Sequence, residues 1–128
     1  MDALLDTHAF LWWLDGDERL SLTVRDLIAD EHNVILFSAA SAWEITTKVR
    51  IGRLPGAVAV ANQLANCLQQ QGFTELPITV GHAQRAGALP GLHKDPFDRM
   101  LIAQAHAENL PLISNEKLFD QYAIQRIW

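Results

Sequence analysis

Four acidic residues carry the chemistry that this sequence suggests, and each lies where a short apolar run gives way to a helix-start signal. They are Asp6, Glu44, Asp98 and Glu116. In a sheet of parallel strands, every strand-to-helix junction lies at the same carboxyl edge, so acids from several junctions can converge into one pocket. Clustered carboxylates repel one another unless a cation neutralises them. The pattern therefore indicates a hard divalent metal, and oxygen-only ligation favours Mg²⁺ or Mn²⁺ over zinc.

Each acid can also be explained by a purely structural role, and the strength of this alternative differs between the acids. Asp6 can cap the helix that follows it. Glu44 lies three residues after Ser41, the spacing of a capping box, and for this residue alone the box is the stronger interpretation. Asp95 precedes a proline, so a cap is favoured there over a metal ligand. Glu116 can be a cap or a first-turn acid.

Asp98 is the acid that a capping role explains least. It shares one helix face with Leu101, Ile102 and Ala105, which turns its carboxylate toward the sheet. An unpaired buried charge is costly, so this acid is either paired or bound to a metal, and we favour the metal. Asp120, by contrast, is expected to face solvent.

The elements that must position these acids can be read from the alternation of short apolar runs with helical patterns. Strands are expected over residues 3–5, 34–37, 74–78, 111–114 and 124–128. Helices are expected over residues 9–14, 21–31, 41–51, 57–70, 80–88 and 96–108. This order predicts an α/β fold whose mainly parallel sheet is covered on both faces. The length of 128 residues fits a single domain over 1–128.

Composition sets further bounds on the class of protein. A hydrophobic content of 49% with mixed charge excludes disorder. The single cysteine, Cys67, excludes an internal disulfide and fits a reducing compartment. No apolar run approaches the roughly 18 residues of a membrane span, and no secretory signal is visible. We therefore expect a cytoplasmic protein without a membrane partner.

The charge distribution is more informative than the net charge of −5. Residues 48–99 carry six bases and three acids, whereas residues 1–47 carry nine acids and two bases. Because the local field attracts a polyanion, the middle segment can hold a phosphate backbone while the acids hold metal. An ordinary solvated face explains the charges equally well.

Other catalytic signatures are missing from the sequence. It has no GxSxG turn, no Walker loop and no GxGxxG turn. The five histidines show no HxxxH or HxH spacing, so surface or satisfied core positions are expected for them. Trp12, Trp13 and Trp43 lie beside the acids, where core packing is favoured over stacking on a nucleobase.

Taken together, the junctions resemble those of the PIN-domain ribonucleases, specifically the toxins of VapBC-type toxin–antitoxin modules. The segments that carry the resemblance are 4–8 (LLDTH), 41–45 (SAWEI) with Lys48, 93–105 (HKDPFDRMLIAQA) and 112–116 (LISNE). They span essentially the whole chain, and the third is the most specific. The resemblance implies a three-layer α/β/α sandwich, metal-dependent hydrolysis of RNA, a homodimer and a cognate antitoxin that blocks the acidic pocket.

The resemblance also implies roles for individual residues. Three family acids map onto Asp6, Glu44 and Asp98, which would hold one or two Mg²⁺ or Mn²⁺ ions. The family's Thr-x-Asp motif maps onto residues 114–116, so Ser114 would hold a water and Glu116 would replace an aspartate, which is a departure. Asp95 is a further candidate ligand. The residues expected to position substrate or water are Thr7, Ser114, Lys48 and Arg99, with Lys94 as another cation near the phosphate.

Two other functions stay open at this point. A degenerate PIN-like module would bind its partner without catalysis, and the change at Glu116 is the observation that favours it. A receiver or phosphotransferase domain also has an acidic metal pocket, but Asp6 lacks the second aspartate that such a site needs.

Overall fold

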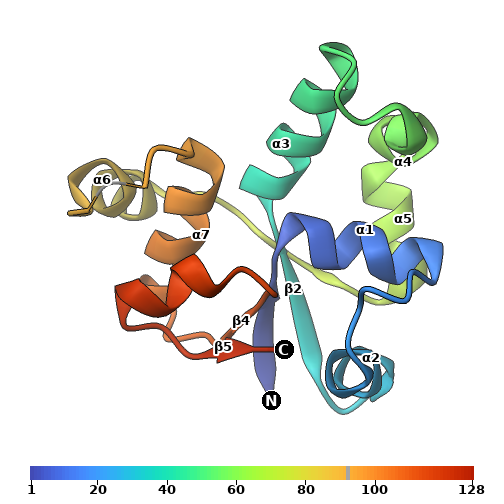
Figure 1. Ribbon diagram of the computed structural model, residues 1–128, viewed down its shortest axis with the longest axis horizontal. Coiled ribbons are helices and arrows are strands. Elements are labelled where there is room, and N and C mark those ends of the chain that lie inside the picture. The colour runs from blue at the N-terminus through green and yellow to red at the C-terminus, as the bar shows by residue number, and fades with distance from the viewer. Residues whose placement is uncertain (92) are drawn as a thin grey trace.

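The computed structural model describes residues 1–91 and 93–128, and a five-stranded sheet in the order β3-β2-β1-β4-β5 lies at its centre (Figure 1). All neighbouring strands run parallel, which confirms the predicted sheet. The strands are β1 (Asp2–Leu5), β2 (Val34–Ser38), β3 (Thr74–Leu76), β4 (Leu112–Ile113) and β5 (Arg126–Ile127). The helices are α1 (Thr7–Asp15), α2 (Leu22–Ala29), α3 (Ala39–Arg50), α4 (Val58–Asn62), α5 (Leu64–Gln71), α6 (Val80–Ala88) and α7 (Pro96–Ala107), with 3₁₀ turns η1 (Pro55–Ala57) and η2 (Lys117–Tyr122).

The sheet is buried on both faces because successive strand residues point to opposite sides. Leu5 and Ile113 pack into one core with residues of α1, α2, α3 and α5. Leu4 and Leu112 pack into a second core with residues of α7 and η2. In Figure 1, α6, α7 and η2 lie on one side of the strands and α1, α2, α4 and α5 on the other. The predicted three-layer α/β/α sandwich is confirmed.

Side-chain caps set the starts of the helices. Asp6, Ser21, Ser38, Thr79 and Asp95 each accept a backbone N–H bond in the first turn of the helix that follows, where donors lack partners inside the helix. Helix α1 ends at a glycine in the left-handed region. No helix within the described ranges is both long and apolar enough to span a bilayer.

One predicted helix, over residues 57–70, was wrong as a single element. The backbone of Gln63 is not helical, with φ −138° and ψ 34°, and it separates α4 from α5. Val60 and Leu64, on either side of the break, both pack against the same core. The break therefore lets two short helices turn an apolar side to one core, a tertiary requirement that overrides local helix propensity.

The direction of winding reverses beside the central strand β1. From β1 the chain builds β2 and then β3 on one side, and it later places β4 and β5 on the other. The Asp6 N–H, just after β1, donates to the Ile113 carbonyl at the end of β4 across 3.0 Å. Open parallel sheets bind ligands in the crevice outside the carboxyl ends of the strands at such a reversal. Asp6 and Ser114 flank this position.

Candidate active site

Asp6 is a helix cap whose carboxyl is also buried beside other acids. Its Oδ1 accepts the Ala9 N–H at 2.7 Å, and only 6% of the residue is exposed. Burial raises the pKa of Asp6 above its usual value, while hydrogen bonds from the Ser114 side chain and the Ala9 backbone lower it and the Glu44 charge raises it. The net direction is upward. Asp6 therefore both caps helix α1 and lies in a pocket with other acids.

Glu44 does not take part in the capping box that its spacing predicts. Ser38 caps α3, so Ser41 lies inside the helix, where its buried hydroxyl is 2.9 Å from that of Thr7. The Thr7 hydroxyl donates to Glu44 Oε1 at 2.6 Å, and Lys48 Nζ lies 2.5 Å from Oε2. Since Thr7 has one proton to give, Ser41 donates to Thr7. Glu44, 3% exposed, is thus turned inward and held by two side chains.

Asp98 lies in the first turn of α7, where Asp95 caps the helix by accepting the N–H groups of Phe97 and Asp98. Burial, followed by the charges of Asp95, Glu44 and Asp6 in that order, raises the pKa of Asp98 to about 7, although the Lys48 charge acts in the opposite direction. Three acids from distant segments thus lie close enough for their charges to interact. Asp95 acts as a cap, as its sequence context favours.

His93 is a site residue that sequence reasoning missed. Its Nε2 lies 3.0 Å from Asp98 Oδ2, within ion-pair distance, although the angle does not meet that of a hydrogen bond. We expected histidines at the surface or in satisfied core positions. His82 fits that expectation, because it is buried and contacts both Thr79 and Glu108. The available signal for His93 was its place just before the capped start of α7.

Glu116 lies outside the group of interacting acids. Its exposed carboxylate caps η2 by accepting the Leu118 N–H at 3.2 Å, and its charge is not among those that shift Asp6 or Asp98. The fully buried Ser114 connects it to the site, since the Ser114 hydroxyl accepts the Glu116 N–H at 3.0 Å and also bonds to Asp6.

The basic residues predicted to contact phosphate lie in different surroundings, as does Asp120. Lys48 lies at the acids, whereas Lys94 is exposed. The Arg99 guanidinium donates to the backbone carbonyls of residues 86, 89 and 93, so it fastens α6 and the following segment to α7. We therefore assign Arg99 a structural role in place of the expected phosphate contact. Asp120, expected to face solvent, pairs with Arg126 at 2.8 Å.

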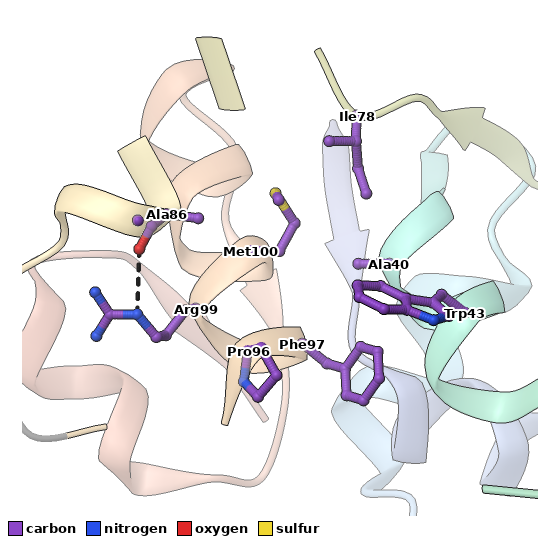
Figure 2. A pocket seen from close by; sticks show the side chains of 9 residues that line it. Ala40, Trp43, Ile78, Ala86, Pro96, Phe97, Arg99 and Met100 are labelled. Carbon is purple, nitrogen blue, oxygen red and sulfur yellow. Dashed lines mark hydrogen bonds between the residues drawn. The ribbon is translucent and has the colours of Figure 1, made fainter. Parts of the chain in front are cut away.

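An apolar groove of about 210 Å³ lies between α3 and α7 (Figure 2). Trp43 and Phe97 face each other there, with ring centroids 4.9 Å apart and an edge-on angle of 80°. Trp43 is 60% exposed, so core packing is not its role, unlike Trp12 and Trp13, which pack against the first core. Arg99 also lines this groove, and its guanidinium points toward the Ala86 carbonyl and not toward Trp43. The exposed Trp43 and the half-buried Phe97 thus adjoin two of the acids in sequence.

The donor set suits a hard divalent cation. Asp6, Glu44 and Asp98 offer only oxygens as ligands. Burial is the main cause of the raised pKa values of Asp6 and Asp98, and the charges of neighbouring acids add to it. Within residues 1–91 and 93–128, no three acids, histidines or cysteines already lie in the arrangement of a metal site. Both Glu44 oxygens are engaged by Thr7 and Lys48. For a cation to bind, the side chains of Asp6, Glu44 and Asp98 would therefore have to move closer together.

The PIN domain family model matches residues 3–125. Ribonuclease VapC22 of Mycobacterium tuberculosis is 30% identical over 116 residues, which are 89% of this chain and 86% of that protein. Ribonuclease VapC16 of the same organism is 39% identical over 62 residues, 48% of this chain and 43% of that protein. A chain in the crystal structure of VapBC2 from Rickettsia felis, bound to a DNA fragment from its promoter, has the same fold. The TM-score is 0.73 and the sequence identity 18%, and the match covers 99% of this chain and 98% of that one.

Proposed function

The chain belongs to the PIN-domain family, and from that premise we propose that it is an endoribonuclease toxin that hydrolyses RNA phosphodiester bonds with Mg²⁺ or Mn²⁺. The observation that carries the proposal is that Asp6, Glu44 and Asp98 lie close enough for their charges to interact. Together with burial and the Asp95 charge, which contribute more, the charges of Asp6 and Glu44 raise the pKa of Asp98 to about 7. These acids meet outside the carboxyl ends of the strands, the position at which such sheets bind ligands.

In the proposed site, Asp6, Glu44 and Asp98 hold one or two divalent ions. A cation there supplies charge that stabilises the phosphodiester as it is attacked and makes water a better nucleophile. Ser114 bonds to Asp6, and Thr7 bonds to Glu44, so both hydroxyls orient ligands. Glu116 is proposed as an outer acid, because it would have to release the Leu118 N–H to reach an ion.

Lys48 is the cation that we propose for phosphate binding. Its ammonium lies against Glu44 at 2.5 Å, and its side chain is 24% exposed. With a divalent cation held beside Glu44, Lys48 would no longer be needed to neutralise this carboxylate, and its ammonium would be free to pair with a phosphate oxygen. Lys48 would thus neutralise part of the acidic charge in the metal-free protein and contact RNA in the metal-bound protein.

The proposed partners follow from the relatives. VapBC2 is a VapB–VapC pair, and we propose that this chain likewise has a cognate VapB-like antitoxin that blocks the acidic pocket and that it forms a homodimer. The groove beside Trp43 and Phe97 offers an apolar surface next to the acids. We place the RNA substrate, and hence the toxin, in the cytoplasm.

The test uses purified, antitoxin-free protein with labelled tRNA and mRNA pools, in Mg²⁺, in Mn²⁺ and in EDTA. Asp98→Asn removes a proposed ligand, and Asp26→Asn, an exposed acid on α2, is the matched control. We expect cleavage that needs metal, survives in the control and vanishes in Asp98→Asn. Metal-dependent cleavage by Asp98→Asn would contradict the site. RNA binding without cleavage by folded wild-type protein would favour the non-catalytic module.

A further inference from the structure

Each of the three clustered acids is approached by a different set of side chains. Asp6 receives bonds from the Ala9 backbone and from Ser114, and Glu44 from Thr7 and Lys48. In the part of the chain that the structure describes, His93 is the only basic side chain within ion-pair distance of the Asp98 carboxylate.

The His93 ring is held in place from several directions. Its side chain is 11% exposed, and its centroid is 6.3 Å from those of both Phe119 and Tyr122. The His93 carbonyl accepts a bond from Arg99 at 3.1 Å, so the backbone is tied to α7 as well. A half-buried ring whose backbone is tied to α7 and which lies beside two aromatic rings can hold a neighbouring carboxylate in one orientation.

The Nε2 atom of this ring is a buried polar group without a hydrogen bond. Buried polar groups in native proteins nearly always have a partner, and each exception needs an explanation. Asp98 Oδ2, only 3.0 Å away, is the partner at hand, and a small rotation of either side chain aligns the two. The neutral imidazole needs only its Nε2–H form to donate.

We propose that His93 is a positioning residue, which donates from Nε2 to Asp98 Oδ2 and so leaves Oδ1 free for a divalent cation. This inference rests on the proposed function, because it takes Asp98 as a metal ligand. Carboxylate ligands are commonly hydrogen-bonded by residues that do not touch the metal, and loss of such a partner typically weakens metal affinity by roughly 10–100-fold.

The test compares two substitutions of similar size in the full-length protein. His93→Gln keeps an N–H donor near the position of Nε2, whereas His93→Leu keeps apolar volume and removes the donor. The readouts are the Kd for Mn²⁺, from the electron paramagnetic resonance signal of the free ion, and the Tm of the metal-free protein. We expect His93→Leu to weaken Mn²⁺ binding by roughly 10–100-fold, and His93→Gln to bind nearly as the wild type does.

A purely structural role for His93 gives a different pattern. Both variants would then lose Tm together, and their Mn²⁺ affinities would fall equally or stay unchanged, which would overturn the inference. Failure of wild-type protein to bind Mn²⁺ would instead contradict the proposed function. For that case, the ¹⁵N and ¹H resonances of the His93 ring are compared between wild type and Asp98→Ala. We expect the Nε2 resonance to move, and an unchanged resonance would refute the contact without reference to any metal.

Discussion

The hydroxyl of Ser38 donates to Oε1 of Gln104 across 2.5 Å, with both residues fully buried. Ser38 ends β2 and caps α3, while Gln104 lies in the middle of α7. The Gln104 amide also donates to the Pro77 carbonyl at 3.2 Å. One side chain therefore fixes α7 to the end of β2 and to the segment after β3, and it sets the helix that carries Asp98 against the helix that carries Glu44.

Gln104→Leu is expected to destabilise the fold through this link. The substitution leaves the Ser38 hydroxyl without its acceptor and the Pro77 carbonyl without its donor, and each buried unsatisfied group costs roughly 1–3 kcal/mol. The free energy of unfolding, measured in urea, should fall by about 2 kcal/mol or more. Ser38→Ala combined with Gln104→Leu should cost less than the sum of the single changes. Additive costs would show that the two residues are not coupled.

Asp98→Asn is expected to stabilise the metal-free protein near neutral pH while it abolishes cleavage. The folded protein holds the Asp98 proton up to a pKa of about 7, well above the ordinary aspartate value of 3.8, so it binds this proton more tightly than the unfolded chain does. Stability should therefore fall as pH rises from about 4 to about 7, a loss that the asparagine variant lacks. A gain of about 1 kcal/mol would raise Tm by roughly 3–6 °C. Equal pH slopes of Tm in both proteins would contradict this explanation.

Lys48→Met should destabilise the metal-free protein, since it leaves the buried Glu44 carboxylate without its cation. We expect a cost of about 1–3 kcal/mol, between those of an exposed and a fully buried ion pair. Mn²⁺ should restore most of the lost Tm, because the ion neutralises the same acids. Lys117→Met, at an exposed lysine, is the control and should change neither value. A cost that Mn²⁺ leaves untouched would argue against a metal beside Glu44.

Arg99→Lys should lower stability without a specific effect on RNA binding. An ammonium cannot reproduce the three guanidinium bonds to the carbonyls of residues 86, 89 and 93, and we expect a loss of roughly 1–3 kcal/mol. At a temperature where the variant is folded, the KM for RNA should match that of the wild type. A raised KM with an unchanged Tm would restore Arg99 to the phosphate-binding role that sequence position first suggested.

The order of strands and helices could be predicted from sequence because apolar periodicity and caps are local signals. Asp95 is an example, since a cap before proline is read directly from the chain. The break at Gln63 could not be predicted, because it depends on which core the two halves of the segment share. The same limit applies to Glu44, whose spacing from Ser41 indicates a capping box although Ser38 holds the cap.

The candidate site could be predicted in part. The approach of Asp6 and Glu44 follows from two strand-to-helix junctions in a parallel sheet. Asp98 lies on α7, which follows α6 and not a strand, and the signal for it was the helix face that it shares with apolar residues. The position of Glu116 outside the group of interacting acids could not be predicted. A strand-to-helix junction does not show how far the following turn carries a side chain. His93 was missed because its partner, Asp98, lies in the first turn of the following helix. The HxH and HxxxH patterns that we searched for relate one histidine to another and do not detect a contact between a histidine and an acid.

The parallel pairing of β1 with β4 bears on when during synthesis this protein can act. Asp6 and Glu44 leave the ribosome before Asp98 and before β4, the strand that pairs with β1 on its second side. Such long-range parallel contacts form late and slowly. A nascent chain therefore holds an incomplete set of acids until α7 and β4 have emerged. With the proposed ribonuclease activity, the ribosome and message that produce the domain are spared until these elements have been made.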